Sequence, residues 1–233
     1  MDDNLLTTTG QALQLLLSFD ADLWNIIWVS FRVSLTAIAI ATVPAILVGF
    51  LLAMVEFKGR WMVIALFNAL MAVPTVVVGL TLYLLLSRSG PFGDLHLLFT
   101  QPAMVIGQIL LSLPLLVCMS HAAFQGIDKR AWETARTLGA NCCVAVWTMV
   151  CEARFALLAA VLAAFGRIIS EVGCSMMVGG NIMSYTRNIP TAIALETSKG
   201  MFAQGVALGL VLLLLALILN FTLASVRGKG QLV

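Results

Sequence analysis

The chain consists of long apolar runs separated by short segments that hold its charged and turn-forming residues. Four of these runs contain no Asp, Glu, Lys or Arg, and a fifth contains only Arg167 and Glu171. A helix needs roughly 20 apolar residues to cross a bilayer, and a barrel strand about 10 alternating ones. The pattern therefore predicts a single transmembrane domain over residues 1–233. Its five helical spans are expected at about 33–55, 61–87, 102–120, 155–178 and 201–226.

The composition excludes the soluble classes. Hydrophobic residues make up 61% of the chain and charged residues 10%, and the mean hydropathy is +1.03. A soluble domain has about 45–50% apolar and about 25% charged residues. The net charge of +2 is too small to indicate a nucleic-acid partner. We therefore expect an all-α integral membrane protein that is in contact with the lipid bilayer.

Alternate loops differ in their content of Lys and Arg, which sets the orientation of membrane helices. One set of segments holds eight such residues: Lys58, Arg60, Lys129, Arg130, Arg136, Arg154, Arg227 and Lys229. The other set holds four: Arg32, Arg88, Arg187 and Lys199. We expect the first set to face the cytoplasm, which places the N-terminus outside and the C-terminus inside. Six carboxylates then outnumber the four outer cations, for a net outer charge of −2: Asp2, Asp3, Asp20, Asp22, Asp94 and Glu196.

The segment before the first span lacks the basic region of a cleavable signal peptide. Leu13–Phe19 is too short to cross a bilayer. We expect it to form an interfacial helix, with Trp24 and Trp28 at the level of the lipid headgroups.

The predicted spans contain residues that permit two interpretations. Pro44, Pro74 and Pro114 are either ordinary membrane-helix prolines or kinks that shape a pathway. Arg167 and Glu171 are four residues apart, so they can pair, either to fix helix packing or as a gate. The same span carries a seam of small residues that suits close approach of another helix: Ala159, Ala163, Gly166, Ser170 and Gly173.

Neutral polar groups occur at a few positions in or beside the spans. Thr75 shares a helix face with Asn68 and Gly79, and it suits either passing contact with a solute or helix packing. The segment Gly179–Asn181 can present backbone N–H groups to an anion, or it can form an ordinary glycine turn.

No sequence motif indicates catalysis. The chain lacks a GxxxxGK[ST] phosphate loop, an HExxH metal motif and a GxSxG elbow. We therefore expect that it is not an enzyme and holds no metal or cofactor of its own. Cys142 and Cys143 are adjacent, and we interpret them as small apolar fillers or, alternatively, as a metal-binding or redox-sensing pair.

A cytoplasmic loop of about 126–154 has the composition of two short helices. Asp128 is a candidate N-cap for a helix that ends near Gly139, where a left-handed C-cap is expected. Asn141 is a candidate cap for a second helix that runs toward Arg154. On the first helix Trp132, Ala135 and Leu138 form one apolar face, which either packs on the protein's own helices or docks a partner.

This loop resembles the signature of a known family. Glu133–Gly139, with the sequence Glu-Thr-Ala-Arg-Thr-Leu-Gly, is similar to the EAA-x3-G pattern of ABC importer permeases. In that family the loop docks into a cleft of a separate ATPase subunit. The I-x-L-P end of the pattern reads Met149-Val150-Cys151-Glu152 here, so its proline is absent.

The resemblance extends over roughly residues 11–226 and narrows to the oxyanion permeases. Phe165–Gly173 resembles the segment after the loop in molybdate and tungstate permeases. Four further stretches resemble the tungstate type: Val73–Thr75, Ser89–Gly93, Met176–Ile182 and Thr191–Gly200.

The resemblance implies a type I ABC importer permease fold with five transmembrane helices, a multi-pass protein of the inner (cytoplasmic) cell membrane. It implies as partners a second copy of the chain, two ATPase subunits that bind ATP and Mg, and an extracytoplasmic oxyanion-binding protein. ATPase coupling is then expected at Asp128, Trp132, Glu133, Thr134, Ala135, Leu138 and Gly139. A pathway or gate is expected at Pro74, Thr75, Arg167, Ser170, Glu171, Gly173, Ser175, Gly179, Gly180 and Asn181.

Several functions stay open on this basis. The expected cargo is tungstate, with molybdate, sulfate and phosphate as alternatives. A passive channel or a self-contained secondary transporter is a different class, but neither a ring of like charges nor an inverted repeat is evident. A structural assembly subunit would explain the small-residue seam but not the long capped loop.

Overall fold

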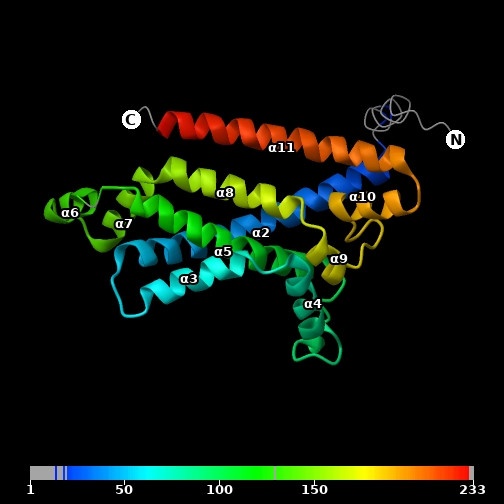
Figure 1. The fold of residues 1–233 in the computed structure, drawn as a ribbon, viewed down its shortest axis with the longest axis horizontal. Coiled ribbons are helices and arrows are strands. Elements are labelled where there is room, and N and C mark those ends of the chain that lie inside the picture. Colours follow the sequence, from blue (N-terminus) through cyan, green and yellow to red (C-terminus); the bar gives the residue numbers. More distant parts are fainter. Residues whose placement is uncertain (1–13, 15–17, 19, 129, 231–233) are drawn as a thin grey trace. The chain divides into compact units, whose positions relative to one another are not determined.

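The computed structural model describes residues 14, 18, 20–128 and 130–230, and over this part of the chain it is helical without strands (Figure 1). The predicted interfacial helix Leu13–Phe19 lies almost wholly outside the described residues. The elements are α2 Ala21–Met54, α3 Arg60–Met71, α4 Thr75–Leu86, the 3₁₀ helix η1 Gly93–Leu95, α5 Gln101–Gln125, α6 Arg130–Thr137, α7 Cys142–Glu152, α8 Arg154–Ile169, α9 Gly173–Gly179, α10 Ile189–Ser198 and α11 Phe202–Gly230.

Three helices are long and apolar enough to cross a membrane: α2, α5 and the Phe202–Thr222 part of α11. Two bent helix pairs, α3 with α4 and α7 with α8, raise the number to five if each pair counts as one span. The described chain is therefore an all-helical protein with three to five candidate spans. The first predicted span, 33–55, falls almost wholly within the longer helix α2, which starts at Ala21 and ends at Met54.

The second predicted span is broken rather than continuous. Its two halves, α3 and α4, meet at a 95° bend between Met71 and Thr75. Pro74 is the N-cap of α4, with φ −60° and ψ 130°. A proline has no N–H to donate and disfavours helical geometry in the residue before it, so the first helix ends and a new one starts.

The fourth predicted span, 155–178, is also interrupted. The helix α8 ends at Ile169 and α9 starts at Gly173, so Ser170–Val172 form a non-helical link. The sixteen residues of α8 are fewer than the roughly 20 that a straight span needs.

The chain divides into two compact units. Unit 1 is drawn from Met1–Ala37, Val73–Leu111 and Phe165–Ile218, and unit 2 from Ile38–Ala72, Ser112–Ala164 and Leu219–Val233.

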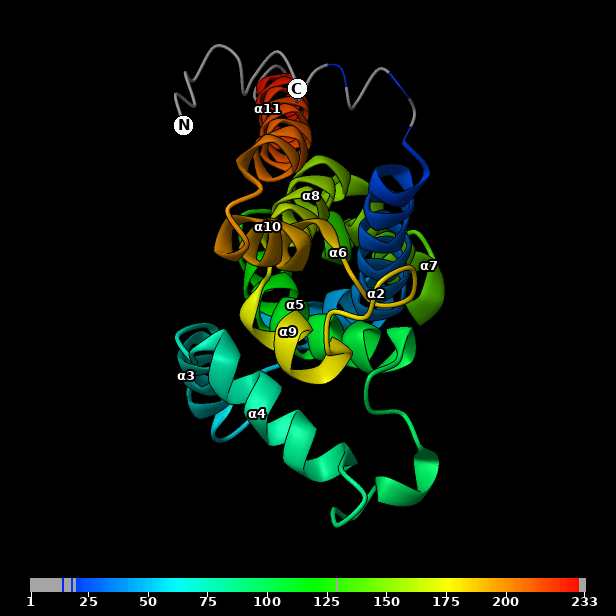
Figure 2. The ribbon, with the colours of Figure 1, turned by 90° about the vertical axis from the view of Figure 1, so that its right-hand side faces the viewer.

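Unit 1 contains two apolar clusters. One joins α2, α4, α5 and α9 through Val33, Leu82, Met104, Cys174 and Val178, all buried, and Figure 2 shows α9 beside α4. The other joins the start of α2 to α10 and α11 and is built from Leu23, Ile27, Ile189, Ala192, Ala207 and Leu208.

The helix α10 was not expected from the sequence. It begins with a capping box, in which Asn188 Oδ1 accepts from the N–H of Thr191 and Thr191 Oγ1 accepts from the N–H of Asn188. Pro190 occupies the first turn, where a missing N–H costs nothing. The N–H of Ile189 donates to Ser30 Oγ of α2 at 2.7 Å, which ties this helix to the first one.

Unit 2 is built around Phe50, Phe124 and Met149, which are buried in one cluster. The rings of Phe50 and Phe124 meet edge to face at 5.2 Å, and Trp132 of α6 lies 5.9 Å from Phe50. The cluster anchors the α6–α7 loop to the rest of its unit.

Candidate functional site

The first helix of the predicted coupling loop starts as the sequence indicates. Asp128 Oδ1 accepts a hydrogen bond from the N–H of Arg130 at 2.9 Å, and the carbonyl of Asp128 accepts from Ala131 at 3.0 Å. The predicted N-cap is therefore confirmed.

The end of α6 is a Schellman turn. The N–H of Ala140 donates to the carbonyl of Ala135 at 3.0 Å, and the N–H of Gly139 donates to Arg136 at 3.1 Å. Gly139 has φ +86°, the left-handed conformation predicted for it. Two residues later Asn141 Oδ1 accepts from the N–H of Val144 at 2.8 Å and caps α7. The two short helices are therefore held in a fixed turn, which we call the coupling hairpin, residues 130–152.

The three residues of the predicted apolar face of α6 differ in their burial. Ala135 is buried, and Trp132 is half-buried against Phe50. Leu138, by contrast, is 82% exposed, because it stands where the helix gives way to the turn. The two interpretations of this face thus apply to different residues: two pack on the protein itself, and the third is free to meet a partner.

The second helix of the hairpin adds an exposed apolar surface that the sequence analysis did not single out. Trp147 is 67% exposed and Val144 is 52% exposed, three residues apart on one face of α7. That three-residue spacing was a usable signal. Together with Leu138, which directly follows α6, these residues place exposed apolar side chains on the turn and on the second helix of the hairpin.

The adjacent thiols of Cys142 and Cys143 are free and exposed in the first turn of α7. They are therefore not buried fillers. Over the described part of the chain, no group of three or more His, Cys, Asp or Glu side chains is arranged to hold a metal ion.

In unit 1 the two helix breaks lie side by side. A Cβ atom on Gly173 would be 2.7 Å from Val76 Cγ2 and 3.2 Å from Thr75 Oγ1. Gly173 opens α9 and Thr75 opens α4. The structure thus brings together Pro74, Thr75, Glu171 and Gly173, four of the predicted pathway residues.

The predicted pairing of Arg167 with Glu171 is wrong. The helix ends at Ile169, between the two residues, so the i, i+4 geometry that pairing needs is absent. Glu171 Oε1 instead accepts from the N–H of Cys174 at 3.1 Å, in the first turn of α9. The Arg167 side chain is exposed. Ser170 is exposed as well, and its hydroxyl donates back to the carbonyls of Gly166 and Arg167.

The end of α9 favours the turn interpretation of Gly179–Asn181. Gly180 has φ +68°, and its N–H already donates to the carbonyl of Met176 at 3.1 Å. A helix C-terminus carries partial negative charge, so this end repels an anion. Gly179 is held against the Met104 side chain.

Two buried polar side chains near the break between α8 and α9 have atoms without a hydrogen-bond partner among the described residues. Ser175 is 2% exposed, and its hydroxyl has no partner among the described residues. Gln108 of α5, also 2% exposed, donates from Nε2 to the carbonyl of Ile168, but its Oε1 is unpaired.

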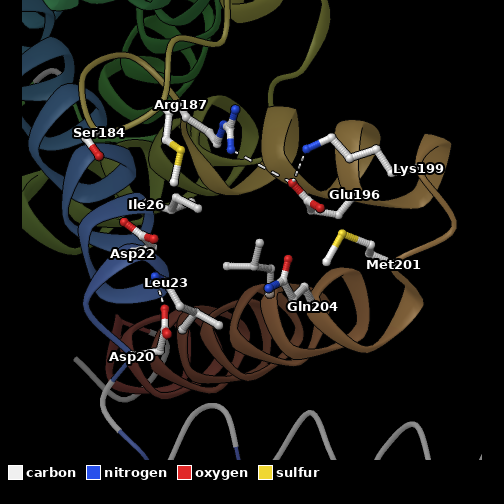
Figure 3. A pocket seen from close by; sticks show the side chains of 12 residues that line it. Asp20, Asp22, Leu23, Ile26, Ser184, Arg187, Glu196, Lys199, Met201 and Gln204 are labelled. Atoms are coloured by element: carbon white, nitrogen blue, oxygen red, sulfur yellow. Dashed lines mark hydrogen bonds and ion pairs between the residues drawn. The ribbon is translucent and has the colours of Figure 1, made fainter.

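A cavity of about 210 Å³ lies elsewhere in unit 1, between the start of α2, the end of α10 and the start of α11 (Figure 3). Buried Glu196 lies between two cations on its wall: its Oε1 is 3.2 Å from Lys199 Nζ and 3.8 Å from Arg187 Nη1. Arg187, Glu196 and Lys199 were expected on the outer side of the membrane, but nothing in the sequence indicated that they would assemble.

The fold and the hairpin define the class of protein. Over the described residues the chain is an all-helical protein with three to five candidate membrane spans. The family described as "Binding-protein-dependent transport system inner membrane component" matches residues 45–226, and the chain belongs to it.

The individual relatives agree with this family. The chain is 44% identical over 166 residues to the tungstate uptake system permease protein TupB of Campylobacter jejuni, covering 71% of this chain and 70% of that one. It is 38% identical over 218 residues to TupB of Peptoclostridium acidaminophilum, covering 94% and 96%.

Among solved structures, a bacterial alginate ABC transporter in complex with its alginate pentasaccharide-bound periplasmic protein has a chain with the same fold. The TM-score is 0.67 at 18% identity, over 89% of this chain and 80% of that one.

Proposed function

We propose that this protein is the transmembrane subunit of an ATP-driven importer that moves tungstate, or a similar oxyanion, from a binding protein into the cytoplasm. The observation that carries the proposal is the coupling hairpin. Its two caps hold the turn rigid, and Leu138 and Trp147 are exposed on it. The hairpin also carries the EAA-like segment Glu133–Gly139.

Tungstate is proposed because both TupB relatives carry that name and one of them matches nearly the whole chain. Molybdate, sulfate and phosphate are the alternatives, since they are also compact oxyanions. The chain holds no cofactor for transport in this proposal, and it performs no catalysis itself. ATP and Mg bind to the partner ATPase, which carries out the hydrolysis.

The working assembly is a homodimer of this chain with two ATPase subunits and an extracytoplasmic binding protein, in the inner (cytoplasmic) membrane. Each copy forms one transmembrane domain of five spans, with its N-terminus outside and its C-terminus inside. The helices α2, α5 and α11, the bent pair α3 with α4, and the helix α8 supply these five spans, and α7 stays in the cytoplasmic hairpin. The excess of Lys and Arg around the hairpin supports the orientation.

In the coupling step, Leu138 and the exposed residues Glu133 and Thr134 enter a cleft of the ATPase. Asp128, Trp132, Ala135 and Gly139 hold the hairpin in shape, through the N-cap, the packing and the Schellman turn described above. When ATP draws the ATPase subunits together, this rigid hairpin transmits the movement to the membrane helices. Such a change needs two discrete packings of the helices.

The pathway is proposed to pass the paired helix breaks. Pro74 and Thr75 on one side and Glu171 and Gly173 on the other form a place where two spans can hinge. Arg167 and Ser170 are exposed beside the break, and Arg167 can offer a positive charge to a passing oxyanion. Ser175 contributes an unpaired hydroxyl, and Gly179, Gly180 and Asn181 form the turn that closes α9.

The test is reconstitution of this protein with its ATPase and binding protein in proteoliposomes. We expect ATP-dependent uptake of tungstate that needs all three components. Uptake without the ATPase would contradict the proposal and favour a channel or secondary transporter. Titrating the binding protein with tungstate, molybdate, sulfate and phosphate, and repeating uptake with each, identifies the cargo.

A further inference from the structure

The cavity between α2, α10 and α11 has the lining of a site for a basic side chain. One part of its wall is apolar and comes from Leu23, Ile26, Met183, Met201 and Leu208. The rest carries three carboxylates, those of Asp20, Asp22 and Glu196, and two cations, Arg187 and Lys199 (Figure 3). An apolar wall with carboxylates suits a Lys or Arg side chain, whose aliphatic stem packs on apolar surface while its head keeps polar partners.

The charges on this wall do not cancel. Both cations, Arg187 and Lys199, are directed at Glu196. Among the described residues, Asp20 Oδ1 accepts from the backbone N–H of Leu23 at 3.0 Å. Asp22 is exposed and has neither a hydrogen bond nor an ion pair with any residue that the structure describes. The α2 side of the cavity therefore carries two carboxylates at a helix N-terminus, and no described side-chain cation pairs with either of them.

The charge and the size restrict the occupant. The wall holds three carboxylates and two cations, a net charge of −1, which disfavours the transported oxyanion. The described residues contain no group of three or more side chains suited to hold a metal ion. A volume of about 210 Å³ corresponds to about seven waters at roughly 30 Å³ each, which is ample for a side chain. The chain's own first 31 residues contain no Lys or Arg.

We infer that this cavity receives a Lys or Arg side chain of the binding protein, with Asp22 as its ion-pair partner. The inference rests on the proposed function, because the orientation given there places Asp20, Asp22 and residues 183–204 outside the membrane. The net charge of −2 on the outer segments favours a basic docking surface on the partner in the same way. The complex of the alginate transporter with its periplasmic protein shows that a protein of this fold associates with such a partner.

The experiment measures ATPase activity of the complete transporter in nanodiscs against the concentration of binding protein. Asp22→Lys is compared with Asp22→Asn and with the control Asp94→Lys, which reverses another exposed outer carboxylate. Asp22→Lys should raise the half-stimulating concentration about tenfold with the same maximal rate, and Asp22→Asn should raise it less. The control should leave it unchanged. A Lys→Glu or Arg→Glu variant of the binding protein, found by scanning its surface, should restore stimulation of Asp22→Lys.

The outcomes separate two failures. If binding protein does not stimulate the unaltered transporter, the proposed function fails and this inference fails with it. If the unaltered transporter is stimulated and Asp22→Lys has the same half-stimulating concentration, only the inference is wrong. If Asp22→Lys instead splits the homodimer, as seen by its mass in detergent, the occupant belongs to the second copy and the inference is also overturned.

Discussion

The Cα atom of Cys174 lies 2.8 Å from the position that a Cβ atom on Gly79 would occupy. Two helices from distant parts of the chain, α4 and α9, therefore touch with no side chain between them at this point. Close backbone approach through small residues is how membrane helices associate when the hydrophobic effect does not drive them together. This contact holds the two helix breaks beside each other.

Gly79→Ala should therefore destabilise the protein. The atom in the way is backbone and cannot swing aside, so we expect a loss of about 1–3 kcal/mol. The matched control is Gly209→Ala in α11, where an added Cβ would meet nothing within 4 Å. That change should be neutral or stabilise the protein, since alanine favours a helix more than glycine does. Thermal unfolding in detergent measures both, and equal melting temperatures would contradict the contact.

Gly139→Leu should weaken ATPase coupling without removing the protein from the membrane. The position has open space around it, so the only cost is the left-handed φ of +86°, about 1–2 kcal/mol for a residue with a side chain. Gly139→Asn is the control, because asparagine tolerates this conformation. ATP hydrolysis stimulated by loaded binding protein should fall in the first variant and be largely kept in the second. Full stimulation of Gly139→Leu would count against the docking role.

Leu138→Asp tests whether the exposed leucine meets a partner. Because the side chain is 82% exposed, the stability of the isolated protein should change by less than about 0.5 kcal/mol. A partner cleft that encloses Leu138 would have to bury the new charge, so copurification with the ATPase should be lost. Leu95→Asp, at another exposed leucine, serves as the control. An intact complex with Leu138→Asp would show that this residue touches nothing.

Local signals made the coupling hairpin predictable. Asp128, Gly139 and Asn141 act on backbone groups within a few residues of themselves, so their roles follow from sequence order alone. Trp147 was missed because its exposure depends on which face of α7 the rest of unit 2 covers.

The helix breaks were predictable only in part. Pro74 indicated a kink, but the 95° bend depends on how α4 packs against α9. No comparable signal marks the end of α8 at Ile169, and the apolar pattern ran across it. The capping box of α10 is local, since Asn188 and Thr191 are three residues apart, but the bond from Ile189 to Ser30 joins residues 159 apart and left no signal in the sequence.

Substitutions of Glu171 test whether its carboxylate only caps the start of α9 or also acts in the pathway. Because its carboxylate accepts from the N–H of Cys174, Glu171→Gln keeps an acceptor and should change stability little, whereas Glu171→Ala should cost about 1 kcal/mol. If Glu171 acts only as a cap, tungstate uptake by Glu171→Gln should equal that of the unaltered protein. A stable Glu171→Gln variant with strongly reduced uptake would instead assign its charge to the pathway.

Within the group Arg187, Glu196 and Lys199, we expect substitutions to differ in how much stability they cost. Arg187 is 14% exposed and Glu196 is 8% exposed, so Glu196→Ala leaves Arg187 largely buried beside an unpaired position and should cost about 3–5 kcal/mol. Lys199 is 47% exposed, so water screens its charge and Lys199→Ala should cost less than about 1 kcal/mol. Thermal unfolding of the two variants in detergent compares them directly. Equal losses would mean that the buried pair contributes no more than the surface one, and that Glu196 does not organise the cavity wall.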